Sequence, residues 1–149
     1  MQGSGKSETT TQISTRTPPA PSSYARLLVV DDFELLRESM SSMVETEPDL
    51  WVVDEAKDGQ EAIELCHQHH PDLVLMDARI PKMNGFEAAR LIKEELPETK
   101  VLIVSTYENP ALVSKAMRVG AEGYIIKLAP LEEILQAIRG ILVGEHRYP

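Results

Sequence analysis

From Arg26 onward, apolar and polar residues alternate in two different patterns along the chain. Short aliphatic and β-branched runs, apolar at nearly every position, are typical of buried parallel strands. Longer stretches between them carry an apolar residue every three or four positions, which is the spacing of an amphipathic helix. The predicted strands are residues 27–30, 51–53, 73–76, 101–104 and 123–126.

Helical patterns separate these strands. The clearest apolar stripes are Leu36, Met40, Met43 and Val44, then Ala89, Ile92 and Leu96, then Leu131, Ile134, Leu135, Ile138 and Leu142. Helix starts are predicted at Asp58, Asn84 and Asn109, because such side chains cap the exposed amide groups of a first turn. Strand and helix alternate five times, so the sequence predicts an α/β fold with a doubly wound, five-stranded parallel sheet and helices on both faces.

Polar residues gather where the predicted strands end. In an open parallel sheet these ends form one cleft, which is the usual place for a site. Three carboxylates in one cleft repel one another and favour a hard cation such as Mg²⁺, while an ammonium group there could neutralise a phosphoryl group. The residues at these ends are Asp31, Asp32, Asp77, Ser105, Thr106 and Lys127.

Four segments in this order resemble the receiver domain of bacterial response regulators. They are VVDD at residues 29–32, LMDARIPKMNG at 75–85, Val104-Ser105, and GAEGYIIK at 120–127. The resemblance extends over roughly residues 26–144. It implies a flavodoxin-like sheet with strand order 2-1-3-4-5.

The resemblance also assigns roles to individual residues. Asp77 would be the phosphoacceptor, and Lys127 would contact the phosphoryl group. Asp32 would bind Mg²⁺ directly, Asp31 would bind it through water, and the carbonyl of Arg79 would be a further ligand.

A conformational switch is implied by the same resemblance. Ser105 would hydrogen-bond the acyl phosphate, and the ring of Tyr124 would move inward in response, altering the face formed by residues 109–144. Arg79 and Tyr107 would border the phosphate, where bulky side chains could slow its hydrolysis.

The segment after Lys127 indicates which type of receiver the chain resembles. Many receivers have proline directly after this lysine, usually with a cis bond, but here the order is Leu128-Ala129-Pro130. With the end of the chain, this points to the NarL/FixJ type, whose receivers usually precede a helix-turn-helix domain. The chain would then be a receiver excised from a longer regulator, the favoured reading, or a natural single-domain protein. Its partners would be a sensor histidine kinase, a second copy in a possible homodimer, and DNA only through an output domain outside this chain.

Composition excludes several classes of protein. Asp and Glu number 24 against 15 Lys and Arg, and the net charge of −9 disfavours direct binding to DNA or an acidic membrane. No apolar run approaches the roughly 20 residues of a transmembrane helix. The only cysteine, Cys66, has no disulfide partner, so a cytoplasmic location is expected. Residues 1–24 are predicted to be a disordered tail, 25–144 the receiver, and 145–149 a tail or the start of a linker.

Other functions fit the sequence less well. A phosphate-independent interaction scaffold would not need Asp31, Asp32, Asp77 and Lys127 together. A flavin carrier would need a glycine- and hydroxyl-rich loop after the first strand, and an aspartyl phosphatase an early nucleophile and a cap; neither is present, so only self-phosphorylation and self-dephosphorylation are expected. A metal cluster at Cys66, His67, His69 and His70, and a phosphate-binding loop at Gly5-Lys6-Ser7, were both disfavoured.

Overall fold

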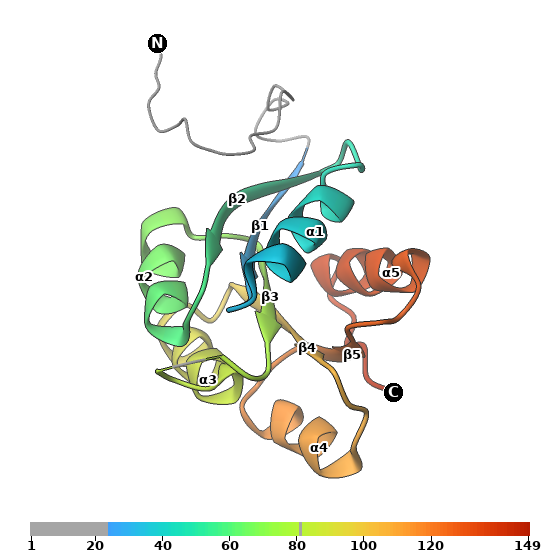
Figure 1. Cartoon of the computed structure of the whole chain (residues 1–149). Coiled ribbons are helices and arrows are strands. Elements are labelled where there is room, and N and C mark those ends of the chain that lie inside the picture. Colours follow the sequence, from blue (N-terminus) through green and yellow to red (C-terminus); the bar gives the residue numbers. More distant parts are fainter. Residues whose placement is uncertain (1–23, 81) are drawn as a thin grey trace.

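The structure, a computed structural model of the chain, describes residues 24–80 and 82–149. Five strands alternate with five helices, as the sequence pattern predicts (Figure 1). The elements are β1 (Ala25–Val30), α1 (Glu34–Val44), β2 (Leu50–Ala56), α2 (Gly59–His69), β3 (Leu73–Asp77), α3 (Gly85–Glu95), β4 (Lys100–Ser105), α4 (Pro110–Arg118), β5 (Gly123–Ile126) and α5 (Leu131–Leu142).

The strands form one parallel sheet in the order β2-β1-β3-β4-β5, which confirms the predicted order. β2 is longer than the predicted 51–53, because Asp54 and Glu55 continue the strand beyond its apolar run. This strand lies at an edge of the sheet, where charged side chains can remain in solvent. Its pairing with β1 shifts by one residue after Leu27, which is a β-bulge.

Two apolar layers hold the helices against the sheet. Leu27 and Val29 of β1 face a core shared with α1 and α5, while Leu28 and Val30 face the core shared with α2, α3 and α4. This alternation follows from the two-residue period of a strand. Helices therefore cover both faces of the sheet, and the loops that follow the strands lie along its carboxyl edge, the end at which all five strands finish (Figure 1).

The predicted helix starts are present. The side chains of Asp58, Asn84 and Asn109 each accept a hydrogen bond from a backbone N–H in the first turn of the following helix. Two members of the predicted apolar stripes are not buried in the core: Leu36 is 41% exposed and Leu131 is 43% exposed. Both lie in the first turn of a helix, next to the carboxyl edge of the sheet, where no strand covers them.

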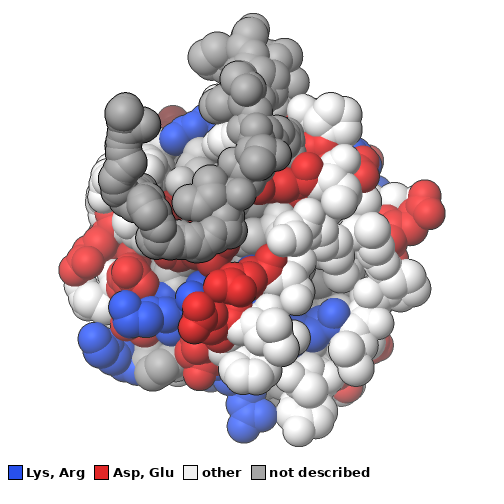
Figure 2. Space-filling view, turned by 45° about the horizontal axis from the view of Figure 1, so that its top comes forward, with Lys and Arg blue, Asp and Glu red and all other residues white. Residues whose placement is uncertain are grey.

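The surface agrees with the acidic composition. On the face in Figure 2, acidic side chains form a broad band with basic side chains scattered among them. Within the described ranges, no helix has the length and apolar character needed to cross a membrane. The predicted N-terminal tail, apart from Tyr24, and the segment Gly5-Lys6-Ser7 lie outside the described residues.

Candidate functional site

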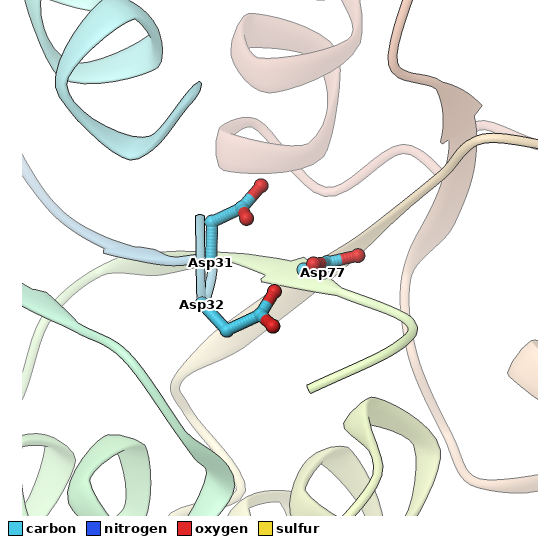
Figure 3. A group of neighbouring side chains, drawn as sticks. All are labelled: Asp31, Asp32 and Asp77. Atoms are coloured by element: carbon cyan, nitrogen blue, oxygen red, sulfur yellow. The ribbon is translucent and has the colours of Figure 1, made fainter. Parts of the chain in front are cut away.

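Three carboxylates meet at the carboxyl edge of the sheet. Asp31 and Asp32 directly follow β1, and Asp77 is the last residue of β3. One oxygen atom from each of the three lies within 4.8 Å of the others, and Figure 3 shows the side chains of Asp31 and Asp32 directed toward Asp77. Asp31 and Asp77 are each only 5% exposed, whereas Asp32 is open to solvent. The cleft thus offers both buried and accessible carboxylate oxygens.

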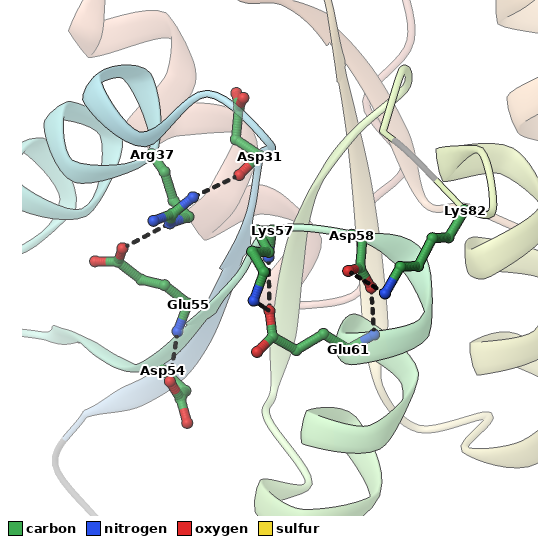
Figure 4. A network of polar contacts seen from close by, with 8 residues as sticks. All are labelled: Asp31, Arg37, Asp54, Glu55, Lys57, Asp58, Glu61 and Lys82. Atoms are coloured by element: carbon green, nitrogen blue, oxygen red, sulfur yellow. Dashed lines mark hydrogen bonds and ion pairs between the residues drawn. The ribbon is translucent and has the colours of Figure 1, made fainter.

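The loop after β1 is held from two sides. The backbone N–H of Phe33 donates to Oδ1 of Asp31 at 2.9 Å, and the guanidinium of Arg37 donates to the Asp31 carbonyl at 3.0 Å. Arg37 also forms a 3.0 Å ion pair with Glu55 of β2 (Figure 4). Arg37 was not singled out from the sequence, because an arginine on a helix surface carries no signal of its contact with a loop. It orients the backbone that places Asp31 and Asp32.

Lys127, just after β5, reaches two of the carboxylates. Its Nζ lies 2.9 Å from Oδ2 of Asp31 and 3.4 Å from Oδ2 of Asp77. Burial alone would lower the pKa of the Lys127 ammonium, but the hydrogen bond to Asp31 and the charges of Asp77 and Asp31 outweigh burial and raise it. Lys127 is therefore a fixed positive charge at the floor of the cleft.

The pKa of the Asp77 carboxyl is raised by its surroundings in the cleft. Burial and then the charge of Asp31 raise the pKa of Asp77 from 3.8 to about 6, against the opposing effects of the Arg79 N–H and Lys127. One ammonium does not balance three carboxylates. Excess negative charge therefore remains, and a divalent cation would relieve it.

The loop between β3 and α3 approaches Asp77 closely. The N–H of Arg79 donates to Oδ1 of Asp77 at 3.2 Å. A Cβ atom on Gly85 would lie 2.1 Å from the Asp77 carbonyl oxygen, so only glycine fits there. Lys82 lies 3.5 Å from Asp58 at the start of α2, which ties this loop to the neighbouring helix (Figure 4). The sequence predicted Asn84 as a helix cap and included Gly85 in the motif of residues 75–85, but it did not reveal the close approach that requires the glycine.

Ser105 and Tyr124, the two residues expected to form a switch, are connected through Tyr107. Ser105 is 1% exposed at the end of β4, and its Oγ accepts a 3.3 Å hydrogen bond from the Tyr107 N–H. The Tyr107 carbonyl in turn accepts a hydrogen bond from the buried hydroxyl of Tyr124. The guanidinium carbon of Arg79 lies 5.9 Å from the centre of the Tyr107 ring. Thr106, also predicted at this edge, is exposed in the loop.

The donor set fits a hard divalent cation. Carboxylate oxygens are the ligands that Mg²⁺ prefers, and these three carboxylates form the only group of this kind found in the described part of the chain. The alternative cluster near Cys66 does not assemble, since His67 contacts Glu95 and His69 contacts Asp54. Among the described residues, the acidic cleft is therefore the best candidate for a metal.

Comparisons with known proteins agree on one family. The response regulator receiver domain family matches residues 27–139. The transcriptional regulatory protein DegU of Brevibacillus brevis is 33% identical over 119 residues, which cover 80% of this chain and 50% of that protein. The chain spans about half the length of the curated relatives it matches.

Solved structures give the same result. A LuxR-family two-component response regulator from Aurantimonas superposes with a TM-score of 0.81 at 37% identity, covering 84% of this chain and 89% of that one. The signal receiver domain of NarL from Mycobacterium tuberculosis has a TM-score of 0.79 at 34% identity, covering 82% of this chain and 98% of that one. The chain therefore belongs to the response regulator receiver domains of two-component systems, signalling modules whose relatives include transcriptional regulators.

Proposed function

We propose that this receiver is a phosphorylation-driven switch in which Asp77 accepts a phosphoryl group from a phosphohistidine of a sensor histidine kinase. The observation that carries the proposal is the position of Asp77, a buried carboxylate beside Lys127 and two further carboxylates at the carboxyl edge of the sheet. At pH 7 a carboxyl with a pKa of about 6 is mostly ionised and can act as a nucleophile.

The chemistry follows from this arrangement. An Asp77 oxygen attacks phosphorus, an acyl phosphate bond forms, and the P–N bond breaks. The electron pair of that bond remains on the imidazole nitrogen, which takes up a proton. Lys127 neutralises charge on the phosphoryl oxygens.

The proposed cofactor is Mg²⁺, with Asp32 and Asp77 as direct ligands, Asp31 acting through water, and the carbonyl of Arg79 completing the protein ligands. The bound ion would supply the positive charge that lets an anionic phosphoryl donor approach an acidic cleft. The donor set described above supports this assignment. Hydrolysis of the acyl phosphate would return the protein to its resting state, and no external substrate is turned over.

An apolar rim beside the cleft suits a protein phosphodonor. A hollow of about 320 Å³ is lined by Leu36, Met40, Met43 and Leu128 and shares Asp31 and Lys127 with the cleft. Of the lining residues, Leu36 and Leu128 are exposed, and Phe33 and Leu35, just before Leu36 in the sequence, are exposed as well. Apolar side chains exposed together at one edge are typical of an interaction surface, and this one would seat the kinase.

The output is proposed to be transcriptional. The matched region is about half the length of curated relatives that are transcriptional regulators, which supports control of a DNA-binding domain outside residues 25–144. Residues 1–24 would be a tail and 145–149 the start of a linker. Cytoplasmic location and homodimer formation belong to the same proposal.

Intact-mass measurement after incubation with acetyl phosphate tests the proposal. We expect a gain of one phosphoryl group that requires Mg²⁺ and is lost in Asp77→Asn. Glu98→Gln is the matched control, since it converts an exposed carboxylate at the opposite edge of the sheet into an amide.

A gain in Asp77→Asn would assign the acceptor to another residue. No gain in wild-type protein at any donor concentration would favour the alternative, a scaffold that binds partners without phosphate.

A further inference from the structure

The chain turns back on itself after α5. Gly144, with φ of 102°, makes the turn, and the following residues return along β5, the edge strand of the sheet. The N–H of Tyr124 donates to the Arg147 carbonyl at 2.9 Å, and the N–H of Arg147 donates to the Glu122 carbonyl at 2.9 Å. The segment thus pairs with an edge that would otherwise present unpaired backbone groups.

Side chains secure this segment. The hydroxyl of Tyr148 donates to the Ala121 carbonyl, and the Tyr148 ring packs on the core cluster that contains Tyr124. Two glycines make room for Arg147. A Cβ on Gly123 would lie 2.8 Å from the Arg147 carbonyl oxygen, and a Cβ on Gly140 would lie 2.6 Å from the Arg147 guanidinium. Glycine destabilises the interior of a helix, and Gly140 lies inside α5. Its presence there is explained by the space that it leaves for the Arg147 guanidinium.

The docked segment is connected to the acidic cleft. Tyr124 pairs with Arg147 through its backbone and with the Tyr107 carbonyl through its hydroxyl. The N–H of Tyr107 donates to Oγ of Ser105, whose carbonyl accepts from the N–H of Lys127 at 2.7 Å. An unbroken series of hydrogen-bonded residues therefore joins the cleft to the C-terminal segment.

We propose that residues 145–148 form a latch on β5 whose docking is coupled to the state of the Asp77 cleft. This inference rests on the proposed function. A phosphoryl group on Asp77 would draw the Ser105 hydroxyl away from the Tyr107 N–H and move the Tyr107 carbonyl. The buried Tyr124 hydroxyl would then lack its acceptor, which is costly, so its ring would shift and loosen the packing of Tyr148. Release would leave the Glu122 carbonyl and the Tyr124 N–H without their partners in Arg147.

Hydrogen exchange of the Tyr124 and Arg147 amides, followed by NMR, measures latch opening directly. Tyr148→Phe removes one hydrogen bond and keeps the ring, so we expect about fivefold faster exchange at both amides. Val143→Ala is the matched control, because its side chain is 78% exposed and its exchange should equal that of the wild type. Unchanged exchange in Tyr148→Phe would overturn the latch.

The coupling is tested on protein whose intact mass shows a phosphoryl group. Exchange at Tyr124 and Arg147 should then be about tenfold faster or more, whereas the amides of Leu28 and Ile103 in the central strands should be unaffected. Equal exchange at the two latch amides with and without the phosphoryl group would refute the coupling.

A failure of the proposed function can be told apart from a failure of the latch. If no phosphoryl group is gained, Tyr124→Phe tests the connection in unmodified protein, because it removes only the hydrogen bond to Tyr107. Exchange at Arg147 should be about fivefold faster in this variant. An unchanged rate would show that Tyr107 and the C-terminal segment are independent, and the inference would be wrong.

Discussion

Burial and the neighbouring charge of Asp31 both oppose a negative charge on Asp77, and its pKa rises from 3.8 to about 6. Lys127 offsets this only in part, since it lies closer to Asp31 than to Asp77. The residue best placed to react is therefore one whose ionised form destabilises the fold. Phosphorylation of Asp77 and binding of a cation would both change this excess of negative charge around Asp77.

The imbalance predicts a pH dependence of stability. The folded pKa of Asp77 lies above its unfolded value, so this carboxyl binds more protons in the folded state between about pH 4 and 6, and its contribution to stability falls as the pH rises through this range. Asp77→Asn removes this fall. Urea unfolding in EDTA should show Asp77→Asn more stable than wild type at pH 7, by on the order of 1–3 kcal/mol, with the difference vanishing near pH 4. Glu98→Gln should keep the wild-type slope; equal slopes in wild type and Asp77→Asn would contradict the prediction.

Arg79 and Tyr107 should control access of water to the acyl phosphate. The guanidinium of Arg79 lies over the Tyr107 ring, a cation–π contact beside Asp77. Removing both side chains in the double variant Arg79→Ala, Tyr107→Ala should shorten the phosphoryl half-life roughly two- to fivefold. This factor corresponds to the free energy of about 0.5–1 kcal/mol that an exposed cation–π pair contributes. The decay of the phosphorylated mass after donor removal measures it. Arg118→Ala on α4 is the control, and an unchanged half-life in the double variant would count against this role.

At the scale of the elements, the backbone at the end of β3 leaves no room for a side chain on Gly85 at the start of α3. In Gly85→Ala, the added Cβ would meet the Asp77 carbonyl oxygen and the Ala78 Cα, both backbone atoms that cannot easily yield. We expect a loss of about 1–3 kcal/mol in urea unfolding and a clear reduction in phosphoryl gain from acetyl phosphate.

Gly120→Ala is the control that distinguishes the steric clash expected in Gly85→Ala from the backbone strain of replacing a glycine. Gly120 has φ of 89°, but a Cβ there would only touch the Lys93 side chain at ordinary contact distance. This variant should lose stability and keep its phosphoryl gain. Normal phosphorylation of Gly85→Ala would show that the loop adjusts without moving Asp77.

The elements themselves could be predicted because their patterns are local. Five apolar runs gave five strands, and the caps at Asp58, Asn84 and Asn109 gave three helix starts. The edge strand β2 was predicted too short, since Asp54 and Glu55 are charged, partly exposed residues that carry no apolar signal. Leu36 and Leu131 keep helical spacing although the sheet does not reach them.

Only those residues of the site that lie at the ends of strands could be predicted from the sequence. The rule that strand ends converge brings Asp31, Asp32 and Asp77 together. Contacts between distant segments leave no local pattern, so the bond from Arg37 to the Asp31 loop and the return of Arg147 along β5 were not foreseen. Both depend on the packing of complete elements.

Across the whole molecule, the acidic cleft and the C-terminal segment lie at different sides of one sheet. The cleft is at the carboxyl edge, and the segment covers the side of β5, with Ser105, Tyr107 and Tyr124 between them. The two cores on either side of the sheet hold this frame, so a change at Asp77 can be transmitted by the loop after β4 without rearranging the fold. A module of this kind suits a signal that must reach another domain.

The net charge of −9 gives the last prediction, because general salt effects and specific cation binding both stabilise an acidic protein. Mg²⁺ bound in the cleft should stabilise the fold by about 2.7 kcal/mol at a concentration about 100 times its dissociation constant. Asp32→Asn tests specificity, since Asp32 is exposed and its replacement should leave stability in EDTA nearly unchanged.

Urea unfolding with Mg²⁺, and with NaCl at equal ionic strength, separates the two effects. Wild type should gain more from Mg²⁺ than from NaCl, while Asp32→Asn should gain equally from both. Equal extra stabilisation by Mg²⁺ in the two proteins would mean that the ion acts on the acidic surface as a whole. The proposal that the three carboxylates form a specific Mg²⁺ site would then be wrong.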